Sequence, residues 1–556
     1  MTDATPAVAL PEPAVQRAAR EAALAAWAQA GTRPPATVAY TSRGRLVVIG
    51  PGEAVAEVCR VWAATAPDLA VRAVCTEGTP PAGVHAARAG RVRVVGHLGR
   101  FALVAEPEGR DLAAELGLDG GADLVLDRQA RPGVSDPLPP PGYRHLPPGD
   151  GAALADAVQA LAELVGTFEK PVYTLYDPDR CARGRSGQSG CTRCLEACPT
   201  GAIADLAERV DIDPYRCQGA GACAAVCPGG AIRHESPRSE ELREAIRRML
   251  KAHREAGGVA PTLLVVAEGE APQAEALPPH VLPLPVEEVG AVGMETWLAA
   301  LAYGAGQVAL ALPEGAPAPV RDALRREVAV AAAILAGLGL GEERVGLLEG
   351  AAEAAALTDP VLPALAPAAY AAVEDKRTAL RLAVDHLRVQ VPPGEAEAVL
   401  PAHAPFGEVR VDRGRCTLCM ACTSVCPTSA LVAGGDTPVL RFIEANCVQC
   451  GICAGACPEQ AITLRARYLY DPAACNAPRV LHEEAPFCCV VCGKPFATAS
   501  VIARIRERVA GHPMFAGAAG RRLEMCEDCR VRDITREELE RSAALPLEAQ
   551  LRRLEG

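Results

Sequence analysis

The chain has 556 residues, of which 50% are apolar, 22% are charged and 3% are aromatic, and its formal net charge is −12. A chain of this length can form several domains, each with its own hydrophobic core. The acidic charge argues against a nucleic-acid partner, because phosphate binding requires a basic surface, and no apolar run reaches the ~18 residues of a membrane span.

The 23 cysteines are unevenly distributed and outline the domain organisation. Only Cys59 and Cys75 precede Cys181, and the span between residues 228 and 415 contains none. So many cysteines indicate either a disulfide scaffold or metal centres. Their Cys-x2-Cys clustering, and an N-terminus unlike a secretory signal, favour reduced thiols that bind metal in the cytoplasm.

The first cysteine-poor stretch predicts an open α/β domain over residues 1–165. Apolar runs of strand length alternate with a helical pattern, which is typical of parallel βαβ units. We expect a helix over residues 53–66 and strands at 45–49, 71–75, 91–95 and 122–126. The Gly50-Pro51-Gly52 turn faintly resembles a dinucleotide fingerprint, but Val55 stands in place of its third glycine, so nucleotide binding is a minor alternative.

Residues 170–236 form the first cysteine-rich segment, which holds two incomplete copies of the phrase Cys-x2-Cys-x2-Cys-x3-Cys-Pro. This phrase binds [4Fe–4S] clusters in bacterial ferredoxins, where three thiolates come from one loop and the fourth comes from the other copy. In the first copy Gln188 occupies the position of the first cysteine, and Cys181 can replace it if loop 182–190 folds away. One cluster is therefore predicted to be bound by Cys181, Cys191, Cys194 and Cys227.

The other cluster position of this segment lacks one thiolate. Ala220 stands where the second copy should have its second cysteine, which leaves Cys198, Cys217 and Cys223. Three thiolates suit a [3Fe–4S] cluster, or a [4Fe–4S] cluster with water or an exogenous ligand on the open iron. The lost negative charge should raise the reduction potential of such a centre. An empty, decayed site is the alternative.

A linker helix and a second α/β domain follow. We expect the helix within residues 237–258, with Ser239 as its N-cap and Gly257 at its end. Its apolar face should pack against a neighbour and consists of Leu242, Ile246, Met249 and Leu250. Residues 259–400 predict an α/β domain without cysteines, because strands alternate with helices. The strands are expected at 262–267, 307–312 and 344–348, and the helices at 294–303 and 320–338.

The second cysteine-rich segment, residues 405–470, contains two complete copies of the phrase. Eight thiols with this spacing predict two [4Fe–4S] clusters, each bound by three cysteines of one copy and the last cysteine of the other. One cluster should be bound by Cys416, Cys419, Cys422 and Cys457. The other should be bound by Cys447, Cys450, Cys453 and Cys426.

Residues 484–535 predict a zinc-ribbon-like domain, and residues 536–556 a tail. Two knuckles provide four thiolates, namely Cys489, Cys492, Cys526 and Cys529. Closed four-thiolate sites usually hold structural zinc and occasionally rubredoxin-like iron. Cys488 is an alternative to Cys489 as a ligand, and Cys475 is expected to be a buried thiol. The stretch 499–509 between the knuckles should form a basic helix.

The predicted fold class is a multidomain chain of α/β and α+β type. Two open α/β domains alternate with two dicluster ferredoxin domains, as in an approximate tandem duplication, and a four-cysteine zinc-ribbon-like domain follows. The expected cofactors are three [4Fe–4S] clusters, one [3Fe–4S] or incompletely ligated [4Fe–4S] cluster, and one zinc ion.

Three stretches together resemble the large bacterial 4Fe–4S dicluster-domain proteins that are encoded beside molybdenum formate dehydrogenases. They are Cys181-x9-Cys191-Thr192-Arg193-Cys194, the run from Pro486 to Phe496, and Met525-Cys526-Glu527-Asp528-Cys529-Arg530. The resemblance covers about residues 90–535 and implies a cytoplasmic iron–sulfur protein. It also implies a partner, a formate dehydrogenase or related molybdoenzyme, which the chain serves as electron carrier or accessory factor. Ala220 departs from the cysteine expected at its position.

We therefore expect an electron-transfer protein that passes single electrons through about four clusters to or from a partner oxidoreductase. The sequence contains no P-loop, flavin fingerprint or Ser/His/Asp arrangement, so we expect no catalysis by the chain itself. Two alternatives remain. The chain could be an accessory or maturation factor for a molybdoenzyme, or a subunit of a larger reductase complex.

Overall fold

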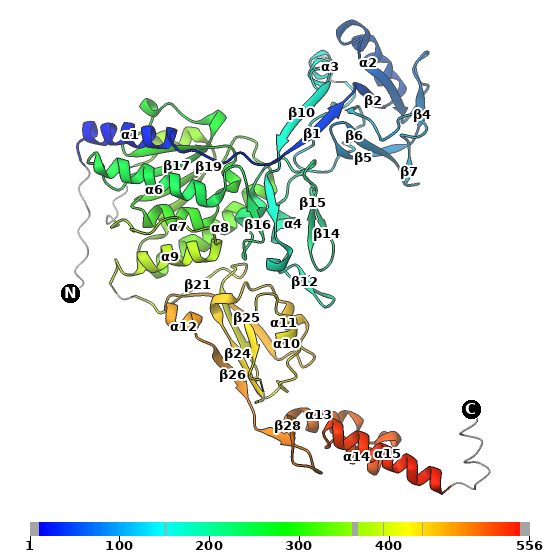
Figure 1. The fold of residues 1–556 in the computed structure, drawn as a ribbon. Coiled ribbons are helices and arrows are strands. Elements are labelled where there is room, and N and C mark those ends of the chain that lie inside the picture. Colours follow the sequence, from blue (N-terminus) through cyan, green and yellow to red (C-terminus); the bar gives the residue numbers. More distant parts are fainter. Residues whose placement is uncertain are drawn as a thin grey trace. The chain divides into compact units, whose positions relative to one another are not determined.

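The computed structural model describes residues 11–149, 151, 153–358, 365–392, 394–435 and 437–544 (Figure 1). These residues form two compact units, one within residues 1–181 and 192–398 and the other within residues 182–191 and 399–556. No described helix is long and apolar enough to cross a membrane. Part of the predicted tail, residues 545–556, lies outside the described residues.

A five-stranded parallel sheet organises the N-terminal part of the first unit. Its strand order is β4-β3-β2-β8-β9, and the strands are Ala86–Arg88, Ala70–Cys75, Arg45–Gly50, Leu124–Asp127 and Tyr143–His145. Successive side chains of a strand point to opposite faces. Leu46 and Val48 of β2 accordingly pack with helices α2 (Gly52–Thr65) and α3 (Leu154–Ala162), whereas Val47 and Ile49 pack on the other face. Three of the four predicted strands are thus confirmed as members of one parallel sheet, and the predicted helix is confirmed as α2, which packs on that sheet.

The fourth predicted strand, β5 (Arg91–His97), forms but lies outside that parallel sheet. It pairs antiparallel with β6 (Arg100–Glu106), which in turn pairs with β7 (Arg110–Asp111). Only Leu98 and Gly99 connect β5 to β6. A two-residue connection can make only an antiparallel hairpin, because a parallel crossover needs a dozen or more residues. The expectation of a parallel strand at 91–95 was therefore wrong.

Helix α1 (Pro13–Ala28) packs with the central sheet rather than with the N-terminal sheet. It runs along α6 (Ser239–Glu255), as the blue and green helices of Figure 1 show. The guanidinium of Arg20 donates hydrogen bonds to the carbonyls of Leu277 and Pro278. The N-terminal helix therefore contributes to the domain that was predicted to begin at residue 259.

Helix α6 buries the apolar face that the sequence predicts. The predicted N-cap is wrong by one residue. Arg238 occupies the N-cap position, and Ser239 is already the first residue of the helix. Gly257 follows the helix with a φ of 88°, which glycine adopts without strain. The predicted end of the helix is thus confirmed.

The central sheet has four parallel strands in the order β18-β17-β19-β20. They are Val281–Val286, Thr262–Ala267, Gln307–Ala311 and Val345–Leu348. Helices α7 (Met294–Ala302), α8 (Ala318–Gly337) and α9 (Lys376–Arg388) accompany it. The predicted strands and helices of this region are confirmed. The sequence pattern missed helix α9 and strand β18, whose two prolines obscure its strand signal.

The two cysteine-rich segments share one arrangement of strands and short helices. In the first, the strands β11 and β16 pair, as do β14 and β15, and helices α4 and α5 follow the cysteine loops. These elements are Thr174–Tyr176, Ile232–His234, Ile203–Asp205, Val210–Ile212, Arg193–Ala197 and Ala222–Ala225. In the second, β22 pairs with β25 and β23 with β24, alongside helices α10 and α11. These are Gly407–Val411, Ile462–Leu469, Leu431–Ala433, Val439–Phe442, Ala421–Ser424 and Ile452–Gly455.

Several smaller elements complete the two units. Strand β1 (Thr37–Ser42) pairs antiparallel with β10 (Gly166–Pro171), and β26 (Arg479–Glu483) pairs with β24. The C-terminal part contains a hairpin of β27 (Pro486–Cys488) and β28 (Pro495–Thr498), followed by three helices. These are α13 (Ala499–Val509), α14 (Ala518–Arg522) and α15 (Glu527–Ala543). The predicted helix over 499–509 is confirmed, and residues 536–543 of the predicted tail continue helix α15.

A buried ion pair stabilises the second cysteine-rich segment. Arg467 donates from Nε to Glu444 Oε1 at 2.9 Å and from Nη2 to Glu444 Oε2 at 2.6 Å, and both side chains are less than 10% exposed. We expect Arg467→Met to destabilise this segment by about 3–5 kcal/mol, because it leaves the Glu444 carboxylate buried without its bidentate partner. Calorimetric unfolding of the cluster-loaded protein measures the loss.

The matched control is Arg410→Met in the same segment, because the Arg410 side chain is 58% exposed and its partner, Glu408, also pairs with Arg465, Arg467 and Arg479. An exposed arginine contributes less than about 1 kcal/mol to such a pair, and Glu408 keeps other cationic partners when Arg410 is replaced. Equal losses in the two variants would contradict a stabilising role for the buried pair.

Candidate iron–sulfur and metal centres

The thiols of each predicted cluster in the second cysteine-rich segment lie together in the crossed arrangement. Burial and the neighbouring charges of Cys416, Cys419 and Cys457 raise the pKa of Cys422 to about 12. Cys457 belongs to the other copy of the phrase, so the two copies exchange their last cysteines. Buried thiols hold their protons when alone, and a bound iron atom, which requires thiolate, would displace them.

The second set of thiols repeats this geometry. Burial and the charges of Cys447, Cys450 and Cys426 raise the pKa of Cys453, and burial raises the pKa of Cys450 to about 11. Each set therefore offers three thiols from one loop and one from the partner loop. That arrangement fits a [4Fe–4S] cluster, and cluster binding by these eight residues remains a prediction.

The backbone of each loop curves in the same way. Leu418 and Met420 in the first loop, and Gln449 and Gly451 in the second, have positive φ angles. Non-glycine residues rarely adopt this conformation, because it strains their backbone. Its presence here indicates that the shape of the loop is fixed by its surroundings. Left-handed residues on both sides of the second cysteine turn the chain around a common centre.

A second backbone feature recurs after each Cys-Pro pair. The residue two positions after the proline has a positive φ in all four phrases, namely Gly201, Gly230, Ser429 and Gln460. In three phrases the next N–H donates to the cysteine sulfur, as from Ala430 to Cys426 at 3.2 Å and from Ala461 to Cys457 at 3.3 Å. The third is the bond from Ala231 to Cys227 at 3.2 Å. Such bonds stabilise a sulfur that carries negative charge.

The three cysteines of the incomplete position also lie together. Burial, followed by the charges of Cys217 and Cys198, raises the pKa of Cys223 well above its usual value. Around Ala220 the backbone keeps the curvature of the complete loops, because Gly219 and Gly221 have φ angles of 84° and 69°. The loop therefore keeps the shape of a cluster-binding loop although one thiol is absent.

The central domain packs against this incomplete loop. A Cβ atom on Gly221 would lie 2.3 Å from Ala291 Cβ, and one on Gly290 would lie 2.4 Å from the carbonyl oxygen of Ala220. Larger residues at either glycine would push the loop and the segment 289–291 apart. The incomplete position is thus held by two domains of the first unit.

Three of the four cysteines predicted to bind the remaining cluster share one hydrophobic cluster. Cys181, Cys194 and Cys227 pack around Val210 and Ile232. Burial, and next a hydrogen bond with Cys181, raise the pKa of Tyr176, to which the charge of Cys194 also contributes. These thiols therefore lie close to the hydroxyl group of Tyr176.

The fourth cysteine, Cys191, closes a hairpin made by the inserted loop. Strands β12 (Gly184–Arg185) and β13 (Gln188–Ser189) pair across Ser186 and Gly187, and the N–H of Cys191 donates to the carbonyl of Ala182 at 2.8 Å. Both turn residues have positive φ, which suits a tight two-residue turn. The insertion is therefore an ordered hairpin that returns the chain to its starting point, as the sequence-based prediction requires.

This hairpin packs against helix α11 within the second unit. A Cβ atom on Gly190 would lie 2.7 Å from the Ile452 side chain, and one on Gly455 would lie 3.2 Å from Gln188 Oε1. The contact places Gly190 against Ile452, the residue that precedes Cys453. Nothing in the local sequence of the loop predicts this partner.

Two lysines contact the first cysteine-rich segment and were not among the predicted site residues. Lys170 donates to the carbonyl oxygens of Tyr215 and Cys217, and burial lowers its pKa to about 8. Lys376 donates to the carbonyls of Ala224, at 2.7 Å, and Ala225. Lys376 is about 150 residues away in sequence, so no spacing rule could have identified it.

The four knuckle cysteines form a compact group. The sulfur atoms of Cys489, Cys492, Cys526 and Cys529 all lie within 4.8 Å of one another. Cys492 and Cys526 have their sulfurs 3.6 Å apart, close to the about 3.8 Å that a tetrahedral site with Zn–S bonds of about 2.3 Å requires. Cys488 is exposed and outside this group, which favours Cys489 as the ligand, and Cys475 is buried as expected.

We expect Cys492→Ser to remove about one zinc per chain, because a structural zinc site needs all four ligands. Metal analysis of the purified variant measures the loss. Cys488→Ser is the matched control and should keep its zinc. Equal zinc loss in both variants, or iron instead of zinc in the native site, would contradict the assignment.

The turn that faintly resembles a dinucleotide fingerprint is closed by protein. A Cβ atom on Gly52 would lie 2.4 Å from the carbonyl oxygen of Thr79, and the Gly52 N–H donates to the Glu77 carbonyl. A phosphate would have to displace both contacts to reach the start of α2. Cys59 and Cys75 pack in the adjacent core.

Comparisons with known proteins agree with the site geometry. Residues 174–228 and residues 407–462 each match a 4Fe-4S dicluster domain. The chain is also similar to a protein named ferredoxin 7Fe from Hydrogenibacillus schlegelii, with 42% identity over 55 residues, which is 10% of this chain and 70% of that protein. The chain therefore belongs to the ferredoxin-type iron–sulfur proteins, with two 4Fe-4S dicluster domains whose function is electron transfer.

Proposed function

We propose that this protein carries single electrons through four iron–sulfur positions to or from a partner oxidoreductase in the cytoplasm. The observation that carries the proposal is the crossed grouping of eight thiols around two curved loops. Such clusters accept one electron at a time at potentials set by charge, hydrogen bonds and exposure. The resemblance to proteins encoded beside formate dehydrogenases supports a formate dehydrogenase or related molybdoenzyme as the partner.

The proposed cofactors are three [4Fe–4S] clusters, one [3Fe–4S] or open [4Fe–4S] cluster, and one zinc ion. Cys198, Cys217 and Cys223 would bind the three-thiolate centre, because the loop around Ala220 keeps its curvature. The name of the similar protein states seven irons, the content of one three-iron and one four-iron centre. This agrees with a three-iron centre beside a four-iron centre in one segment of the present chain.

A stopped-flow experiment tests the proposal. Partners are first isolated with the native, cluster-loaded protein as bait, and the visible bands of the clusters are then followed after mixing with the partner and its substrate. We expect bleaching or recovery of these bands within the turnover time of the partner, and at least a tenfold slower change in Cys422→Ala. The control, Cys475→Ala, alters a buried thiol outside the predicted ligand sets and should behave as the native protein.

A strain that lacks the gene separates the accessory role from the carrier role. A maturation factor would leave its partner inactive when the gene is deleted, even with artificial electron acceptors. A carrier would leave the partner active with those acceptors. Inactivity under these conditions, together with no electron transfer in the stopped-flow experiment, would overturn the proposal.

A further inference from the structure

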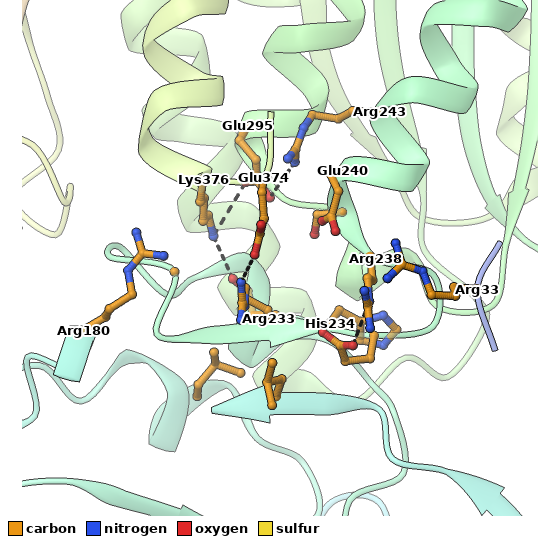
Figure 2. A pocket seen from close by; sticks show the side chains of 16 residues that line it. Arg33, Arg180, Arg233, His234, Arg238, Glu240, Arg243, Glu295, Glu374 and Lys376 are labelled. Carbon is orange, nitrogen blue, oxygen red and sulfur yellow. Dashed lines mark hydrogen bonds and ion pairs between the residues drawn. The ribbon is translucent and has the colours of Figure 1, made fainter. Parts of the chain in front are cut away.

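A polar cavity of about 250 Å³ lies beside the first cysteine-rich segment (Figure 2). Helices α5, α6 and α9 and strand β16 contribute to its walls. Six cationic side chains and four glutamates line it. The cations are Arg33, Arg180, Arg233, Arg238, Arg243 and Lys376.

The cations at the rim are matched by carboxylates. Arg238 pairs with Glu235 at 2.9 Å, and Arg233 pairs with Glu374, the latter pair drawn near the centre of Figure 2. Their charges largely cancel. The rim by itself therefore has little attraction for an anion.

The inner wall has an excess of positive charge. Arg243 Nη1 lies 3.7 Å from Glu295 Oε1, and Lys376 Nζ lies 3.6 Å from Glu295 Oε2. Among the lining residues one carboxylate thus faces two cations, and all three side chains are at most 16% exposed. The buried Glu327, outside the lining, also acts on Lys376 but is itself paired with Arg193. Charges in such a poorly solvated place are weakly screened.

Arg243 has nitrogen atoms that donate no hydrogen bond to any described residue. Its side chain is 1% exposed, and Nη2 donates to the carbonyl of Val373 at 2.7 Å. Nε and Nη1 find no hydrogen-bond acceptor among the residues that the structure describes. A buried charged donor without an acceptor costs free energy, so binding an acceptor is favourable. An oxyanion is the best acceptor, because its hydrogen bonds with a guanidinium are charge-assisted.

Helix α6 strengthens this preference. It begins at Ser239, has 17 residues and has no side-chain hydrogen bond at its N-cap. Ser239 and Glu240 of its first turn line the cavity. The free N–H groups and the positive end of the helix dipole favour a negative ligand. Glu240 opposes that preference and sets a limit on affinity.

We propose that this cavity binds a small oxyanion, such as inorganic phosphate or a short carboxylate, and that the bound anion lowers the reduction potential of the iron–sulfur centre at Cys223. Lys376 connects the two places, because it pairs with Glu295 and also donates to the carbonyl of Ala224, the residue after Cys223. A negative ligand next to Lys376 offsets its charge. Because the oxidised centre is less negative than the reduced one, the cavity binds the anion more tightly when the centre is oxidised.

Calorimetry on the oxidised, cluster-loaded protein tests binding, with sodium phosphate, sulfate and acetate as probes. We expect saturable binding of at least one of them, and the order among the three distinguishes a phosphate site from a carboxylate site. Arg243→Gln should weaken binding at least tenfold, and Arg238→Gln, at the rim, should weaken it less. Glu240→Gln should tighten it. The control Arg248→Gln, on the same helix but 60% exposed and paired with Glu244, should leave it unchanged.

A redox titration tests the coupling. If the anion binds the oxidised form tenfold more tightly, saturating anion lowers the potential of the centre by about 59 mV for a one-electron couple. The Arg238→Gln variant keeps the proposal testable should Arg243→Gln fail to fold. Absence of binding for all three anions, or binding that neither cavity variant weakens, would overturn the site. Binding with an unchanged potential would overturn the coupling. Because calorimetry requires no electron transfer to a partner, its outcome is independent of the proposed carrier function.

Discussion

Replacing Cys457 with alanine is expected to remove the cluster of the other cysteine phrase and to leave the cluster of its own phrase intact. Cys457 lies with Cys416, Cys419 and Cys422, whose charges act together on the pKa of Cys422. A [4Fe–4S] cluster that loses one of four thiolates in a partly exposed loop is readily lost. Iron analysis should therefore show a loss of about four irons per chain.

Paired variants distinguish crossed from local ligation without ambiguity. If ligation is crossed, Cys419→Ala combined with Cys457→Ala affects one cluster, and the chain loses about four irons. Cys450→Ala combined with Cys457→Ala then affects both clusters, and the chain loses about eight irons. Local ligation predicts the reverse order. Cys475→Ala, also a buried cysteine of the second unit, is the control and should retain all its iron.

Replacing Ala220 with cysteine is expected to convert the three-thiolate centre into a complete [4Fe–4S] cluster. Gly219 and Gly221 already give this loop the left-handed turns found on both sides of the second cysteine in the complete loops. Ala220 itself is only partly buried, so a thiol can be added without overpacking. We expect a gain of about one iron per chain, loss of any three-iron EPR signal, and a lower potential for this centre.

The control for this variant is Gln218→Cys, which adds a thiol to the same loop two residues away. Its side chain donates to the carbonyls of Leu138 and Pro139, away from the position of the second cysteine in the phrase. It should gain no iron. A gain of about four irons in Ala220→Cys would instead show that the native position is empty.

The sequence predicts those features that depend on short spacing. Cys416 to Cys457 follow a phrase in which two-residue gaps dictate how a loop curves, and the observed grouping of thiols agrees with it. Strands such as β17 and β19 are apolar after their first residue, which is typical of a parallel sheet buried on both faces. Residue type and spacing therefore specify the loops and the sheet strands.

Features that depend on distant partners could not be predicted in this way. The direction of β5 is a different case, because the adjacent two-residue turn at Leu98 and Gly99 decides it and the strand pattern alone does not contain it. Helix α1 is amphipathic, and its sequence does not say that α6 will cover it. The cavity around Arg243 combines residues from 33 to 376, and no local motif connects them. Tertiary packing supplies this information.

The inserted hairpin has a consequence for the order in which the protein can be assembled during synthesis. Its contact, helix α11, is translated about 260 residues later, so the hairpin has no packing partner while the first unit emerges. The backbone also passes between the two units at three points, 181–182, 191–192 and 398–399. Cleavage at any single one leaves the units covalently joined, and a chain truncated at 398 retains the hairpin without its support. The inserted residues 182–191 of the first cysteine-rich segment thus depend for their packing on the C-terminal half of the same polypeptide.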